Sequence, residues 1–124
     1  MFLQIDLTWL LDIAQREIPG DPEIVDFGAL EAARARHAFR VMDTPVYDQP
    51  HHRAAALLQQ LARVPALEHS NELYALAVAA GYLHASGYQV RVPSKEAGDL
   101  VEQVTVGRAG VREIAAVLKE WTRR

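Results

Sequence analysis

Histidines and carboxylates are the side chains of this sequence that are best suited to chemistry. The five histidines are His37, His51, His52, His69 and His84. Imidazole is a common metal ligand and general base. However, no H-E-x-x-H or comparable ligand spacing occurs, and adjacent histidines point in different directions on a helix. The pattern therefore favours exposed surface histidines over a metal site.

Other catalytic signatures are missing from the chain. Cysteine is absent, which excludes disulfides, thiolate metal sites and cysteine nucleophiles. No serine lies in a G-x-S-x-G context, and neither a G-x-G-x-x-G nor a P-loop pattern occurs. A basic cluster comprises Arg34, Arg36, His37 and Arg40. It suits an acidic partner, a nucleic-acid phosphate or the C-terminal end of a helix. Arg34 and Arg36 do not share a helix face, which favours the structural interpretation.

Length and composition indicate one globular domain over residues 1–124. Hydrophobic residues make up 50% of the chain and charged residues 23%, with a formal net charge of −3. No basic stripe of the kind that nucleic-acid binders carry is present. The apolar start is interrupted by Asp6 and Asp12, and the uncharged run over residues 73–83 is too short to span a membrane. We therefore expect a cytoplasmic protein that contacts neither nucleic acid nor membrane.

The hydrophobic periodicity predicts about six helices and almost no sheet, an all-α fold. The first helix is expected after an Asp6 N-cap, with a stripe of Leu7, Leu10, Leu11, Ala14 and Ile18, and the second from Asp26 to about His37. Residues 42–50 are expected to form a loop or small hairpin, and residues 51–64 the third helix. Two more helices are predicted after a Ser94 cap and from Val111 to Trp121, with a short strand over residues 88–92 between the central helix and the Ser94 cap.

A central buried helix is predicted from Ser70 to Ser86, with Ser70 as its N-cap and Gly87 as its left-handed C-terminal residue. Its apolar residues cover most of the circumference, and one stripe comprises Leu73, Leu76, Ala77, Ala80 and Leu83. Trp9 and Trp121, on the first and last helices, are expected to close the core; either one, if exposed, would mark a protein interface.

Three segments resemble the Doc (death-on-curing) branch of the Fic family. Residues 26–36, DFGALEAARAR, resemble that branch's D-x-G-x-L-E-x-A-x-A-R segment. Residues 54–63 resemble the helix before its active loop, and residues 82–88 the end of its central helix. The resemblance runs without gaps from Asp26 to Tyr88 and implies a single Fic/Doc-like domain, with the hairpin beside the active loop.

The active loop of this family resembles H-x-F/L-x-D-G-N-K-R. The resemblance implies a histidine base for a target hydroxyl, an acid that binds Mg²⁺, a Gly-Asn turn that opens a helix N-terminus to phosphates, and a Lys/Arg pair that holds phosphate charge. These parts suit nucleotidyl or phosphoryl transfer, which requires positioning, a metal and cations.

The matching stretch here, residues 65–73 (the motif segment), departs from that pattern. Pro65 stands at the base position, Leu67 at the apolar one, His69 at the acid and Ser70 at the glycine; Glu72 and Leu73 replace the Lys and Arg. Among the positions with a chemical role, only Asn71 matches. We expect ATP and Mg²⁺ binding to be lost, because the base, the acid and both cations are missing.

Three interpretations of the motif segment follow. It is a plain connection in which Ser70 caps a helix and Glu72 suits the first turn, or a repurposed pocket, or a slipped loop in which Glu68 replaces the acid. For function, the resemblance implies a degenerate bacterial toxin-family protein that binds a protein partner, such as an antitoxin-like segment, in a toxin–antitoxin-like setting. The alternative is an active transferase with altered chemistry that uses His69, Asn71 and Glu72. Self-association stays open.

Overall fold

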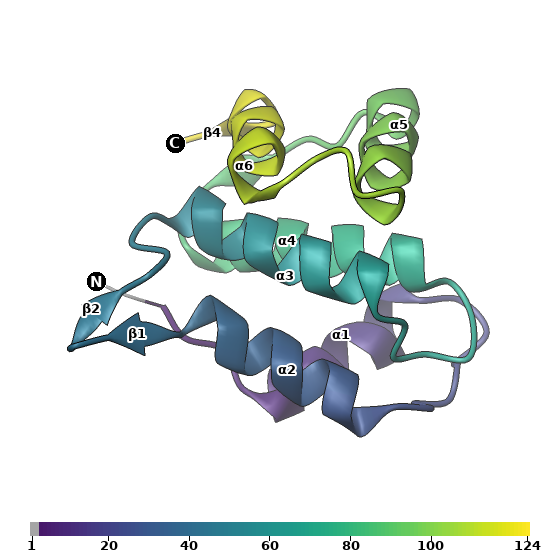
Figure 1. Ribbon diagram of the computed structural model, residues 1–124. Helices are drawn as coiled ribbons and strands as arrows, with labels where there is room; N and C mark the ends of the chain where they lie inside the picture. Colours follow the sequence, from purple (N-terminus) through teal and green to yellow (C-terminus); the bar gives the residue numbers. More distant parts are fainter. Residues whose placement is uncertain (1–2) are drawn as a thin grey trace.

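The computed structural model describes residues 3–124 and confirms the predicted all-α fold, with six helices and four two-residue strands in this range (Figure 1). The helices are α1 (Leu7–Glu17), α2 (Phe27–His37), α3 (Pro50–Arg63), α4 (Asn71–Ala85), α5 (Ser94–Thr105) and α6 (Val111–Glu120). The strands are β1 (Arg40–Val41), β2 (Thr44–Pro45), β3 (Gln89–Val90) and β4 (Thr122–Arg123). No helix within the described residues has the length and apolarity needed to cross a membrane.

The helices form three layers. The pair α3 and α4 runs through the middle, α1 and α2 lie on one side, and α5 and α6 lie on the other (Figure 1). The small residues Ala54, Ala55 and Ala56 allow neighbours to approach α3 closely, and they are fully buried. Accordingly, α3 packs against α2, α4, α5 and α6.

The α4 helix lies where the sequence predicts the central helix, but it buries a different face. Its buried residues are Tyr74, Ala75, Val78, Ala79, Tyr82 and Leu83. Of the predicted stripe only Leu83 is buried; Leu76, Ala77 and Ala80 are half-buried, and Leu73 is 47% exposed. A helix that is apolar on several faces carries no periodicity that identifies the buried one. The most deeply buried helix is α3, with nine of its 14 residues buried against six of 15 in α4.

The sequence predicts some of the helix N-caps correctly and others wrongly. Asp6 and Asp26 cap α1 and α2, where their carboxylates accept hydrogen bonds from Trp9 N at 2.9 Å and Ala29 N at 3.1 Å. The predicted Ser94 cap is wrong, because Ser94 is the first residue of α5 and Pro93 precedes it without a side-chain bond.

Both small sheets are antiparallel. A hairpin is present as β1 and β2, with Val41 opposite Thr44, but it spans residues 40–45 and not the predicted 42–50. The strand predicted over residues 88–92 is shorter, and β3 pairs with β4 at the chain's C-terminal end. Gly87 ends α4 with a φ of +100°, as predicted.

The hairpin does not lie beside the motif segment, contrary to expectation. It precedes α3 and the motif segment follows α3, so the two occupy opposite ends of that helix (Figure 1). At 1.5 Å per residue, the 14 residues of α3 separate them by about 20 Å.

Candidate functional site

The motif segment is tied to the chain that precedes α2. Val25 N donates to Ala66 O at 2.8 Å, and Glu68 N donates to Glu23 O at 3.0 Å. These bonds flank an antiparallel bridge between Ile24 and Leu67. Leu67 is 2% exposed, so its side chain anchors the segment in the core. The loop is therefore held in place by backbone bonds from a distant part of the sequence.

Both polar atoms of the Asn71 side chain are engaged within this loop. Its Oδ1 accepts hydrogen bonds from Ala66 N at 3.0 Å and Leu67 N at 2.9 Å. Its Nδ2 donates to Leu67 O at 2.9 Å. The one matching chemical position of the motif thus closes the turn between α3 and α4.

Ser70 occupies the position before α4 without capping it. Its backbone is left-handed, with a φ of +64°, and its side chain makes no bond to the helix, which corrects the predicted cap. A left-handed backbone favours glycine, and glycine is the residue that the resemblance implies at this position. The Ser70 hydroxyl instead contacts His69 Nδ1 at 2.8 Å.

His69 and Glu68 both make local contacts. The His69 ring lies close to Gly20, where an added Cβ would be 3.4 Å from its Cε1 atom, an ordinary van der Waals distance. Glu68 Oε1 accepts a hydrogen bond from Glu23 N at 2.9 Å. The carboxylate that a slipped loop would recruit therefore already supports the link to the chain before α2.

The outer side of the motif segment is anionic and apolar. Glu72 and Leu73 are exposed on the first turn of α4, and Pro65 is exposed at the start of the segment. Within residues 3–124, no hydrogen bond or ion pair engages the Glu72 side chain. A helix N-terminus presents free N–H groups, and here a carboxylate lies next to them.

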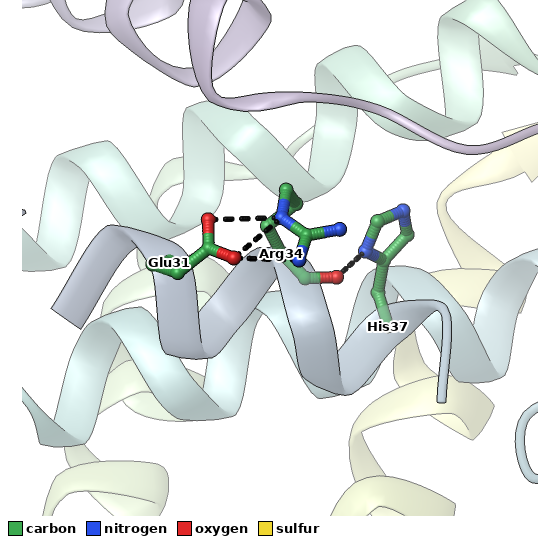
Figure 2. Close-up of polar contacts among 3 residues, drawn as sticks. All are labelled: Glu31, Arg34 and His37. Carbon is green, nitrogen blue, oxygen red and sulfur yellow. Dashed lines mark hydrogen bonds and ion pairs between the residues drawn. The ribbon is translucent and has the colours of Figure 1, made fainter. Parts of the chain in front are cut away.

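Two members of the predicted basic cluster, Arg34 and His37, make local contacts within α2 (Figure 2). Arg34 forms an ion pair with Glu31 at 2.6 Å, which lowers the pKa of Glu31 and raises that of Arg34. Arg36 reaches the other way, to Tyr47 and to Gln59 and Gln60 on α3. The two guanidinium groups are thus directed to different partners, as the spacing predicts.

Two histidines predicted to be exposed are buried. His37 Nε2 accepts a hydrogen bond from Ile5 N at 3.1 Å, and its Nδ1 donates to Arg34 O (Figure 2). His51 Nε2 donates to Thr122 Oγ1 at 2.9 Å, because the Thr122 hydroxyl itself donates to Lys119 O. Burial lowers the pKa of both imidazoles, and the charges of Arg34 and Lys119 act in the same direction.

The remaining histidines do not assemble a metal site. His69 and His84 are exposed, and His52 is half-buried. Across the part of the chain that the structure describes, no three His, Asp or Glu side chains lie close enough to hold a metal ion.

A buried cation is the polar feature that the sequence did not reveal. Arg53 on α3 is 2% exposed. Its Nε donates to Tyr82 Oη at 2.6 Å and its Nη1 to Tyr47 O at 3.0 Å. Charged groups are rarely buried without such partners. The sequence did not indicate that Arg53 is buried, because a charged residue is normally expected at the surface, although three alanines follow it directly.

A groove of about 420 Å³ lies between α1, α4 and β3. Trp9 and Ile13 line one side, and Ala77, Ala80 and Gly81 line the other. Trp9 is half-buried, whereas Trp121 is 7% exposed and belongs to the core. An added Cβ at Gly81 would lie 3.4 Å from the Trp9 ring, so small residues let the indole rest on α4. No residue of the motif segment lines this groove.

This helical arrangement, with a tied loop and an asparagine at the start of a central helix, is a Fic/Doc-like domain. Over 101 residues the sequence is 37% identical to a protein named Toxin Doc from Mycolicibacterium smegmatis. The match covers 80% of this chain and 78% of that protein. The chain belongs to the Doc family of toxins. No protein-family model matches the sequence.

Proposed function

We propose that this Doc-family protein acts by binding another protein and lacks the nucleotidyl or phosphoryl transfer that the family's signature implies. The observation that carries the proposal is the state of the motif segment. Asn71 is engaged in three hydrogen bonds within its own loop, and Glu72 places a carboxylate beside the free N–H groups of α4.

Charge argues against a bound nucleotide at this loop. A helix N-terminus attracts phosphate through its N–H groups and dipole. Glu72 repels an anion from the same groups, and the exposed Leu73 offers no cation to offset it. The residues present therefore do not fit ATP with Mg²⁺.

The family's base position holds no base, and its acid position holds no carboxylate. Proline cannot accept a proton, so Pro65 cannot activate a hydroxyl. His69, at the position of the acid, contacts Ser70 and does not converge with two other ligands. These contacts support the interpretation of the segment as a structural connection.

The groove between α1 and α4 is the surface that we assign to a protein partner. It combines a half-buried tryptophan with small apolar residues, and tryptophan is enriched at the energetic centres of interfaces. The relative is named a toxin, which supports a toxin–antitoxin setting. We propose an antitoxin-like segment as the occupant and the cytoplasm as the compartment.

Co-purification with the product of the neighbouring gene tests this assignment. We expect Ala80→Arg, which fills the groove with a charged side chain, to weaken binding at least tenfold. Ala116→Arg is the matched control, because Ala116 is exposed on α6 away from the groove. Equal binding by both variants would contradict the assignment of the groove.

An altered transferase remains the second candidate, since His69 Nδ1 lies 2.8 Å from the Ser70 hydroxyl. A hydroxyl next to an imidazole is the minimal arrangement of a nucleophile and its base. Incubation with labelled ATP, Mg²⁺ and cell lysate separates the two candidates. Transfer that disappears in His69→Ala would favour the enzyme, and absence of transfer would favour the binding protein.

A further inference from the structure

The cleft between α5 and α6 is distinct from the motif segment and from the groove at Trp9. Both helices rest on α3, and they stand apart from each other at the edge of the molecule (Figure 1). The space between them is about 400 Å³. Its apolar lining comprises Leu100, Ala109, Val117 and Trp121.

Carboxylates line both sides of this cleft. Glu96 and Asp99 come from α5, while Glu113 and Glu120 come from α6. Each pair lies three or seven residues apart, and this spacing places both members on one face of their helix. Arg108 is the one cation that lines the cleft among the described residues. Four carboxylates therefore surround an apolar floor with one guanidinium.

These acidic side chains have little use within the fold. Across residues 3–124, no side-chain hydrogen bond or ion pair engages Glu96, Asp99 or Glu120. Glu113 accepts a hydrogen bond from Gly110 N at 2.9 Å as part of the α6 N-terminus. Glu96 lies in the first turn of α5, where the helix dipole favours a carboxylate, whereas Asp99, three residues further on, adds a like-charge repulsion that a cationic ligand would relieve.

We propose that the α5–α6 cleft binds a cationic amphipathic segment of a partner protein. Apolar side chains of that segment would enter between Leu100 and Val117, and flanking lysines or arginines would face the two acidic rows. The mode is that of an amphipathic segment in a groove, in which apolar residues give affinity and complementary charge gives selectivity. This proposal is independent of nucleotide binding and of the groove at Trp9.

Fluorescence anisotropy with synthetic peptides tests the cleft. The probe is a labelled 14-residue peptide in which leucines recur at helical spacing on one face and lysines occupy the opposite face. Two further peptides keep the same pattern, one with glutamate in place of lysine and one with serine in place of leucine. We expect the intact protein to bind the leucine–lysine peptide at least tenfold more tightly than either of the others.

Two charge-reversed variants locate the binding. Glu96→Lys with Glu120→Lys reverses charge on both sides of the cleft, and we expect at least tenfold weaker binding. Asp48→Lys with Glu102→Lys makes the same change in net charge at exposed positions that do not line the cleft. This control should bind within twofold of the unmodified protein. Circular dichroism should report the same helix content for both variants.

Several outcomes would overturn the proposal. Equal losses in the two charge-reversed variants would mean that net charge alone attracts the peptide. Equal binding of the leucine and serine peptides would mean that the apolar floor has no role. Concentration-dependent dimers that Glu96→Lys with Glu120→Lys abolishes would assign the cleft to a second copy of the chain.

Discussion

The side chain of Asn71 makes a paired contact with the backbone of Leu67, accepting from its N–H and donating to its C=O, both at 2.9 Å. A neighbouring β-strand would pair with the backbone N–H and C=O of one residue in the same way. The Asn71 contact fixes the turn before α4 while the opposite edge of the same turn bonds to residues 23–26. An amide at this position is thus required by the fold whether or not the loop binds a ligand.

Asn71→Ala should lower the free energy of unfolding by about 2–4 kcal/mol. The change leaves the N–H groups of Ala66 and Leu67 without partners, and both residues are buried. A buried polar group that loses its partner costs about 1–3 kcal/mol. Urea denaturation at neutral pH measures the loss. Asn71→Asp keeps the acceptor and loses the donor, so its loss should be smaller; a change below about 0.5 kcal/mol in the alanine variant would contradict this account.

The two buried histidines should make stability depend on pH. Burial lowers the pKa of His37 and His51 in the folded state, so the unfolded state takes up protons first. Their contribution is complete above the unfolded value of about 6.5 and is lost as pH falls through that value toward the folded pKa. We expect the free energy of unfolding to decrease between pH 7.5 and pH 5, by at most about 1.4 kcal/mol per pH unit for each histidine.

Glutamine variants separate these histidines from the exposed ones. In the unmodified protein, protonation of His37 removes the acceptor for the Ile5 N–H group. His37→Gln removes this titrating group, so the free energy of unfolding should fall less steeply as pH decreases. His84→Gln is the control, since His84 is exposed and should leave the pH profile unchanged. A profile that is identical in all three proteins would show that His37 does not contribute to the pH dependence.

The hairpin turn should be stabilised by residues that suit its backbone. Met42 and Asp43 have φ values of +51° and +66°, the type I′ conformation that favours Asn-Gly. Met42 is 95% exposed, so its replacement removes little packing. Met42→Asn with Asp43→Gly should slow amide exchange at Val46, whose N–H donates to Phe39 O at 2.9 Å, by about two- to tenfold. Met42→Ala should leave that exchange unchanged.

Local interactions explain which parts of the fold the sequence predicts. The caps at Asp6 and Asp26 bond to residues three positions ahead, so the signal and its partner lie in one short window. Helix positions were predicted to within one or two residues for the same reason. Ser70 and Ser94 have the right side chain for a cap, but the surrounding chain gives Ser70 a left-handed backbone and makes Ser94 part of the helix.

Long-range partners explain what could not be predicted. His37 and His51 are buried because Ile5 N and Thr122 Oγ1, 32 and 71 residues away, satisfy their ring nitrogens. The motif segment was identified from the sequence by its resemblance to the family's active loop, and the structure places residues 65–70 in the connection between α3 and α4 and residues 71–73 in the first turn of α4. The link between Glu68 and Glu23, 45 residues apart, is a tertiary contact that no local pattern records. The bonds of Asn71 span only four or five residues, but no standard capping or turn pattern in the sequence predicts them.

Restoring the base position alone should not restore nucleotide chemistry. Pro65→His supplies an imidazole, but the loop still lacks a metal-binding acid, and Glu72 still repels phosphate. We therefore expect no saturable isotherm with millimolar ATP and Mg²⁺ by calorimetry, and no transfer from labelled ATP. The unmodified protein should behave in the same way, and a saturable isotherm with sub-millimolar affinity for it would contradict the proposed function.

Reversing the charge at the start of α4 should have a larger effect than restoring the base. Glu72→Lys with Leu73→Arg removes the repelling carboxylate and places two cations beside the free N–H groups of the helix. We expect this variant to bind ATP measurably, with an affinity that falls as salt concentration rises. Glu102→Lys, an exposed reversal on α5, is the control and should not bind. Transfer should require Pro65→His and His69→Asp as well, since only then are base, acid and cations all present. Failure of the charge-reversed variant to bind ATP would show that the loop geometry set by Asn71, and not the charge of Glu72, excludes the nucleotide.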